Sequence, residues 1–102
     1  MATRAMIYVE NTDGTYDGIY THWDGYPEHH LPILEKSYNT EEKVRELISM
    51  GDTSVLDESI ESSVFYCRDR NEDINIRKNL DKKDLQKEEY NYLFKNKKWK
   101  LI

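Results

Sequence analysis

The fold is decided by residues 3–23, which read TRAMIYVENTDGTYDGIYTHW. β-Branched and aromatic residues, which favour strands, stand on both sides of Asn11-Thr12-Asp13-Gly14, a cluster of turn formers that ends in glycine. This pattern predicts a hairpin with strands over 3–10 and 15–23. The alternation of side chains breaks at Asp17-Gly18, and we expect a β-bulge near Gly18 to restore it.

Two helices are expected after this hairpin. A loop over 24–30 is indicated by an Asp-Gly pair and a proline, and a short helix over 31–38 follows it. Asn39 or Thr40 then caps a second helix, which ends at Gly51 and whose apolar residues recur at i, i+3 and i+4.

The second half of the chain predicts two more hairpins. Residues 52–63 have weak periodicity and are expected to form a loop with about one helical turn. Strand-forming residues over 64–68 and 73–78 are joined by Arg70-Asn71-Glu72, which predicts the second hairpin. Asp81 resembles the N-cap of a short helix that ends near Glu89. Alternating aromatic residues around a turn over 95–97 predict the third hairpin, with Tyr90, Tyr92 and Phe94 on its first strand and Trp99 and Leu101 on its last.

These elements predict one α+β domain over 1–102. Its sheet is expected to be mainly antiparallel, with about six short strands in hairpins and two or three helices packed on one face. Charged residues make up 34% of the chain, a share that favours disorder, whereas aromatic residues make up 12% and include eight Tyr. Because aromatic rings bury large areas, we expect a folded domain with an aromatic core.

The charge pattern limits the class of partner. The net charge of −5 lies entirely in residues 1–51, whereas residues 95–102 carry four Lys and no acid. A general nucleic-acid surface is therefore disfavoured, although a local basic patch is allowed.

The same composition bears on location. The single cysteine, Cys67, cannot form an internal disulfide, and the first thirty residues contain no secretory signal pattern. No apolar run reaches the roughly 20 residues that a membrane span needs. A cytoplasmic location without membrane contact is therefore expected.

The densest group of chemically versatile side chains is His22-Trp23-Asp24-Gly25-Tyr26-Pro27-Glu28-His29-His30. Imidazoles and carboxylates at this density could bind a ligand or a metal, or exchange a proton, although their spacing matches no metal signature. The simpler interpretation is that Trp23 and Tyr26 pack in the core, Asp24 caps the turn and the histidine pair is solvated. We expect no metal and no cofactor.

A second group is Arg68-Asp69-Arg70, with Arg4 as a third cation if the first strand lies alongside. Two arginines at a hairpin tip could clamp a phosphate or carboxylate, and the simpler interpretation is a turn neutralised by salt bridges. The lysine-rich end with Trp99 could stack a base, and the simpler interpretation is an edge strand whose lysines discourage edge-to-edge pairing. The candidate ligand- or partner-binding residues are thus Arg4, His22, Trp23, Asp24, Tyr26, Arg68 and Arg70.

The major enzyme motifs are absent from the sequence. There is no P-loop, no dinucleotide-binding glycine pattern, no zinc-protease motif and no serine in a nucleophile elbow. Cys67 lies in a predicted apolar strand, where thiols are usually inert. We therefore favour a function without catalysis.

Four segments together carry a resemblance to a known group of proteins. They are Met1-Ala2-Thr3-Arg4, His22-Trp23-Asp24-Gly25-Tyr26-Pro27, residues 66–73, and residues 89–94 with Trp99. With them the chain resembles a family of small, mostly uncharacterised bacteriophage and prophage proteins, of which the W-D-G-Y-P core is the most specific feature. The resemblance implies a phage protein acting in the host cell and brings no established reaction with it.

Size, missing enzyme motifs and phage setting together suggest an accessory protein that counters host antiviral defence by binding. Its acidic face would bind a host effector protein in place of nucleic acid, or a pocket of Arg4, Trp23, Tyr26, Arg68 and Arg70 would sequester a nucleotide signal. The alternatives are a small metal- or acid/base-dependent enzyme for a nucleotide-like substrate that uses His22, Asp24, Glu28 and His29, and a structural or regulatory phage protein. The last would form a homo-oligomer through an edge strand.

Overall fold

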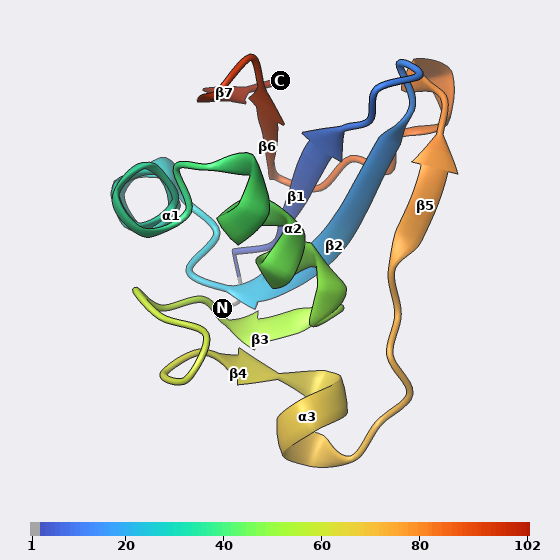
Figure 1. The fold of residues 1–102 in the computed structure, drawn as a ribbon. Helices are drawn as coiled ribbons and strands as arrows, with labels where there is room; N and C mark the ends of the chain where they lie inside the picture. Colours follow the sequence, from blue (N-terminus) through green and yellow to red (C-terminus); the bar gives the residue numbers. More distant parts are fainter. Residues whose placement is uncertain (1–2) are drawn as a thin grey trace.

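One mixed sheet organises the chain in the computed structural model, which describes residues 3–102 (Figure 1). The strands are β1 (Ala5–Glu10), β2 (Tyr16–Trp23), β3 (Thr53–Val55), β4 (Val64–Phe65), β5 (Arg77–Leu80), β6 (Tyr90–Lys95) and β7 (Lys98–Leu101). Their order is β4-β3-β2-β1-β6-β7, and β5 also pairs with β2. The pairs β1–β6 and β2–β3 are parallel and the others antiparallel, so the predicted α+β class with a mostly antiparallel sheet is confirmed. Residues 1 and 2, which begin the phage-like pattern, lie outside the described part of the chain.

The predicted first hairpin is confirmed, and the irregularity predicted near Gly18 occurs in the pairing of β2 with β5 and not within the hairpin. The register of β1 and β2 is continuous from Ala5 opposite Thr21 to Glu10 opposite Tyr16. Gly18 has another purpose, because a Cβ placed there would lie 2.3 Å from the Tyr8 ring. The glycine therefore lets an aromatic ring cross the neighbouring strand, and the irregularity in register falls on the other side of β2, in its pairing with β5.

The predicted C-terminal hairpin is also confirmed. Lys95 pairs with Lys98, and the two residues between them, Asn96 and Lys97, have φ values of 53° and 63°. Two consecutive positive φ angles match the type I′ turn, whose twist suits a two-residue hairpin. Parallel pairing with β1 then places β6 inside the sheet.

The helices α1 (Pro27–Ser37) and α2 (Glu41–Ser49) cover one face of the sheet (Figure 1). The first begins four residues earlier than the predicted 31, because Pro27 suits the first helical position and lacks the amide that would be unpaired there. The Thr40 hydroxyl caps α2 by accepting a hydrogen bond from the Lys43 amide at 3.3 Å. Gly51 follows the helix with φ of 79°, as expected for its C-terminal glycine.

The opposite face of the sheet carries a smaller core, and the segment after β5 covers it. Leu80 and Leu85 pack against buried residues that include Met6 and Tyr8, and the Tyr8 hydroxyl donates to the Gln86 carbonyl. The helix predicted from Asp81 to Glu89 is wrong, since only the 3₁₀ turn η1 (Lys82–Asp84) forms. The two leucines therefore hold an extended segment against the sheet, and they do not flank the start of an α-helix.

The predicted hairpin of 64–68 and 73–78 is wrong as well. The chain leaves β4 at Phe65 and forms the short helix α3 (Tyr66–Arg70), which ends at Asn71 with φ of 55°. The Asp69 carboxylate accepts a hydrogen bond from the Phe65 amide at 2.8 Å and so stabilises the helical turn. The chain then crosses to β5, which pairs with β2, while Thr53–Val55 forms a strand in the predicted loop over 52–63.

Candidate functional site

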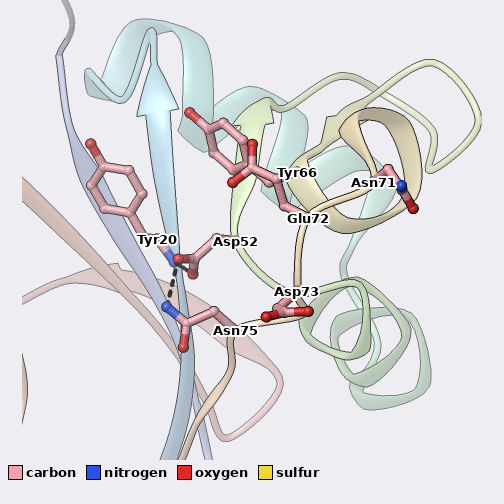
Figure 2. Close-up of a pocket in the computed structure, with 7 residues that line it drawn as sticks. All are labelled: Tyr20, Asp52, Tyr66, Asn71, Glu72, Asp73 and Asn75. Carbon is pink, nitrogen blue, oxygen red and sulfur yellow. Dashed lines mark hydrogen bonds between the residues drawn. The ribbon is translucent and has the colours of Figure 1, made fainter.

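A cavity of about 630 Å³ lies where β2, the start of β3, α3 and residues 71–76 meet (Figure 2). Residues 71–76 connect α3 to β5, and we call them the crossing segment. Its lining consists of Tyr20, Asp52, Tyr66, Asn71, Glu72, Asp73 and Asn75. Figure 2 shows Tyr20 on the β2 side of this space and Asn71 on the α3 side. The mixture of rings, carboxylates and amides gives the cavity both stacking surfaces and hydrogen-bonding groups. We call it the acidic cavity.

Asp52 connects the separate elements that form the acidic cavity. Its carboxylate accepts hydrogen bonds from the Tyr20 amide at 2.9 Å and from the Asn75 side chain at 3.0 Å, and it forms an ion pair with Arg77. Its backbone amide donates to the Asn75 carbonyl, and its carbonyl accepts from the Tyr66 amide. Asp52 therefore holds β2, α3 and the crossing segment together, and its charge is neutralised by Arg77.

The α3 wall of the cavity is held by Arg70. The Arg70 guanidinium lies 5.1 Å from the centroid of the Tyr66 ring and donates to the Ser54 hydroxyl at 3.3 Å. After the left-handed Asn71, the Glu72 amide donates to the Tyr66 carbonyl at 3.1 Å. This turn directs the chain from the end of α3 along the side of the cavity.

The opening of the cavity is negatively charged. Glu72 and Asp73 are exposed, and neither has an ion-pair partner among residues 3–102. The charged residues of the lining, Asp52, Glu72 and Asp73, are all acidic, and only Asp52 is neutralised by an ion pair, with Arg77. A cationic group is therefore electrostatically favoured there.

Tyr20 extends the site along β2. Its hydroxyl lies 2.7 Å from His22 Nδ1, and the Trp23 ring packs edge-on against His22 with centroids 4.8 Å apart. Burial raises the pKa of Tyr20, and the positive charge of Arg4 partly opposes that rise. Two predicted site residues, His22 and Trp23, thus follow Tyr20 in a row of ring contacts at the end of β2, which we call the aromatic ridge. Neither of them belongs to the cavity lining.

The aromatic residues of the W-D-G-Y-P segment do not pack in the core as the simpler interpretation expected. Trp23 is 40% exposed and Tyr26 is 37% exposed. The exposed Asp24 has φ of 56°, which turns the chain out of β2. Tyr26 precedes the first residue of α1 as its N-cap, without a side-chain hydrogen bond to the helix.

Arg68 has a structural role. Its guanidinium donates to both carboxylate oxygens of Asp69 at 3.0 Å, to the Ile60 carbonyl at 2.8 Å and to the Ser63 carbonyl at 2.6 Å. It also lies 5.0 Å from the centroid of the Phe65 ring. The ion pair with Asp69 agrees with the simpler interpretation of this segment as a neutralised turn. None of the three predicted arginines, Arg4, Arg68 and Arg70, belongs to the lining of the acidic cavity. Arg70 lies next to it, over the ring of the lining residue Tyr66.

The adjacent histidines have different environments, and the expectation that both are solvated is wrong. His29 Nε2 lies 3.0 Å from the Leu56 carbonyl oxygen. His30 is fully buried and stacks on Tyr92, and neither of its ring nitrogens has a hydrogen-bond partner in the part of the chain that is described. Burial, followed by the neighbouring His29, lowers the pKa of His30 to about 4.

Glu28 lies in the first turn of α1, and within residues 3–102 no three His, Cys, Asp or Glu side chains gather as metal ligands.

Most of the cavity lining was missed by sequence reasoning. The sequence pattern predicts a hairpin for Tyr66 and residues 71–75, and a hairpin places successive side chains on opposite faces. Asp52 directly follows Gly51, after α2. No sequence pattern around Asp52 indicates its contacts with residues 20, 75 and 77. Asn71 carried the one usable signal, since asparagine tolerates the left-handed conformation that ends a helix.

Comparisons with known protein families, curated proteins and solved structures found no match to this chain. No helix within residues 3–102 is long and apolar enough to cross a membrane.

Proposed function

We propose that this chain is a non-enzymatic binding protein whose acidic cavity docks a positively charged segment of a partner protein. In the phage setting that its sequence resembles, the partner is a host protein of antiviral defence. The observation that carries the proposal is the pair of unpaired carboxylates, Glu72 and Asp73, at a cavity walled by two tyrosines.

An arginine side chain fits the chemistry of this cavity. A guanidinium stacks on tyrosine rings and donates paired hydrogen bonds to carboxylates. The protein already contains one such stacking contact, since Arg70 lies over the Tyr66 ring, although Arg70 donates to the Ser54 hydroxyl and not to a carboxylate. Tyr20 on the opposite wall, together with Glu72 and Asp73, offers both a ring and carboxylates to a guanidinium from outside.

A phosphate group fits the cavity less well, because Glu72 and Asp73 would repel it. Two of the arginines near the cavity already donate to protein atoms, Arg70 to Ser54 and Arg77 to Asp52, and Arg4 is not part of the lining. A protein partner is therefore better supported than a sequestered nucleotide.

The walls of the cavity are preorganised for binding. Five hydrogen bonds and ion pairs to Asp52 hold Tyr20, Tyr66, Asn75 and Arg77 in place before any partner arrives. A partner then loses less free energy to the ordering of the site. The exposed Trp23 at the end of the aromatic ridge supplies an apolar contact of the kind that dominates protein interfaces.

The test is titration of the full chain into a fluorescent peptide that alternates arginine and serine, followed by anisotropy. We expect saturable binding that the double variant Glu72→Gln/Asp73→Asn weakens by about tenfold, because two charge contacts are lost. The matched control Glu35→Gln/Glu46→Gln removes two exposed charges from α1 and α2 and should bind as the wild type does. If both double variants weaken peptide binding equally, the net charge of the protein explains the effect, and the assignment of the site is wrong.

Two further measurements address the identity of the partner. Capture from a bacterial host lysate should enrich a protein with the wild type and the Glu35→Gln/Glu46→Gln control, and should lose it with Glu72→Gln/Asp73→Asn. Calorimetry against a panel of cyclic nucleotides should give no heat of binding. Tight nucleotide binding without peptide binding would replace this proposal with sequestration of a nucleotide signal.

A further inference from the structure

The outer edge of β7 ends one side of the sheet (Figure 1). β7 pairs with β6 on one side, and no strand within residues 3–102 pairs with it on the other. An unpaired strand edge presents a row of backbone donors and acceptors that can accept another strand.

The phase of the β6–β7 ladder identifies which residues face outward. The Ile102 amide donates to the Asn91 carbonyl at 2.9 Å, so the backbone groups of Ile102 point toward β6. Because backbone direction alternates along an antiparallel strand, those of Lys98 and Lys100 point the same way. The N–H and C=O groups of Trp99 and Leu101 therefore point away from the sheet.

The side chains of β7 differ between its two faces. Trp99 is buried on the helical face, where its Nε1 donates to the Tyr38 carbonyl at 2.8 Å, and Leu101 lies on the same face but is 45% exposed. Lys98 and Lys100 are exposed on the other face. An incoming strand would thus meet lysines on one face and an exposed leucine on the other.

We propose that β7 accepts an additional strand from a partner protein, and that this strand alternates acidic and apolar residues. Its acidic side chains lie beside Lys98 and Lys100, and its apolar side chains lie beside Leu101. The same edge of a second copy is a poor partner, because residues 95–102 carry four lysines and no acid, and like charges on adjacent strands repel. The lysines therefore restrict this edge to acidic strands.

This interaction is separate from the acidic cavity, which none of the β7 residues lines. A test can use the full chain and a short fluorescent peptide that alternates glutamate and valine, with a peptide that alternates glutamate and glycine for comparison. We expect the valine peptide to bind and the glycine peptide to bind at least about tenfold more weakly, because glycine lacks the apolar contact and disfavours the strand.

The decisive variant is Leu101→Pro. Proline removes the outward amide of residue 101 and leaves the amides that bond to β6, so β7 should stay in the sheet while the edge is blocked. The control Leu101→Ala keeps that amide and loses most of the side chain. We expect Leu101→Pro to abolish binding and Leu101→Ala to weaken it only severalfold, with unchanged circular dichroism for both. Equal binding by the wild type and Leu101→Pro would overturn the proposal.

Charge and assembly supply a second pair of readouts. Lys98→Glu/Lys100→Glu should abolish binding of the glutamate–valine peptide, whereas Lys82→Glu/Lys83→Glu, which reverses two exposed charges in η1, should leave it intact. Light scattering should show a monomer without peptide. A stable dimer that Leu101→Pro dissociates would show that a second copy occupies the edge, and would overturn the assignment to an acidic partner.

Discussion

The Tyr92 hydroxyl donates a 2.6 Å hydrogen bond to the backbone carbonyl of Gly25, across 67 positions of sequence. The Gly25 amide donates in turn to the Thr3 carbonyl at 2.8 Å. Through these two bonds, the turn in the W-D-G-Y-P segment joins the start of β1 to the interior strand β6. Gly25 therefore has a structural role, since long-range hydrogen bonds fix the turn that lies just before α1 begins at Pro27.

Replacement of Gly25 by alanine should destabilise the fold. A Cβ at this position would lie 2.6 Å from the Thr3 carbonyl oxygen and 2.7 Å from the Ala5 Cβ, so the backbone of β1 must move. We expect a loss of about 2–3 kcal/mol in the free energy of unfolding, measured by urea denaturation. Gly14→Ala is the control, because nothing lies within 4 Å of its Cβ and only its φ of 84° opposes the change, at about 1 kcal/mol. A smaller effect at Gly25 than at Gly14 would contradict the role of close approach.

Tyr92→Phe should cost about 1–2 kcal/mol in the free energy of unfolding, because it leaves the buried Gly25 carbonyl without its donor. Tyr16→Phe is a matched control, since the Tyr16 hydroxyl lies 3.5 Å from Glu10 in a partly buried contact too long to contribute much. Thermal melts of both variants would make the comparison. If the two variants are equally stable, the Tyr92 bond is not the link described above.

Protonation of His30 should make the fold sensitive to mild acid. Its pKa is lowered to about 4 by burial and by His29, whereas an exposed imidazole titrates near 6.5, so the unfolded chain binds the proton first. The contribution of His30 to stability is therefore complete above about pH 6.5 and is lost as the pH falls toward 4, by about 3 kcal/mol in all. Unfolding free energies measured from pH 7 to 4 would show this slope.

The variant that isolates this effect is His30→Phe, which keeps a ring against Tyr92 and removes the titrating group. We expect it to flatten the profile between pH 6.5 and 4. Carboxylates such as Asp13 and Asp69, whose pKa values are held low by hydrogen bonds with Thr15 and Arg68, should leave a slope at lower pH. Parallel profiles for the wild type and His30→Phe would show that the imidazole is not the sensitive group.

Asp52→Ala should lower both stability and binding at the acidic cavity. The change leaves Arg77 and the Asn75 side chain without their acceptor, and we expect a loss of about 2–3 kcal/mol in the free energy of unfolding. Asp73→Ala removes an exposed carboxylate from the same lining and should change stability by less than about 0.5 kcal/mol. Denaturation measures the effect of each variant on stability, and peptide anisotropy measures its effect on binding. An Asp52→Ala protein as stable as the wild type would contradict the role of Asp52 as the connecting residue.

The amino-acid sequence by itself determined the elements whose contacts are local. The hairpin over 3–23, the helix capped by Thr40 and the hairpin turning at Asn96-Lys97 depend on residues that lie close together along the chain. Periodicity, capping and turn preferences act over that range and were sufficient to predict these elements.

Tertiary structure alone decided α3, β3 and the acidic cavity. Residues 66–70 have strand-forming neighbours, but Arg68 reaches the carbonyls of Ile60 and Ser63 and favours a helical turn. Asp52 meets partners 32, 23 and 25 positions away, and its contacts exist only once β2, β5 and the crossing segment have assembled. Local propensity is worth fractions of a kcal/mol per residue, on the order of 0 to 1, so a few long-range hydrogen bonds and ion pairs override it.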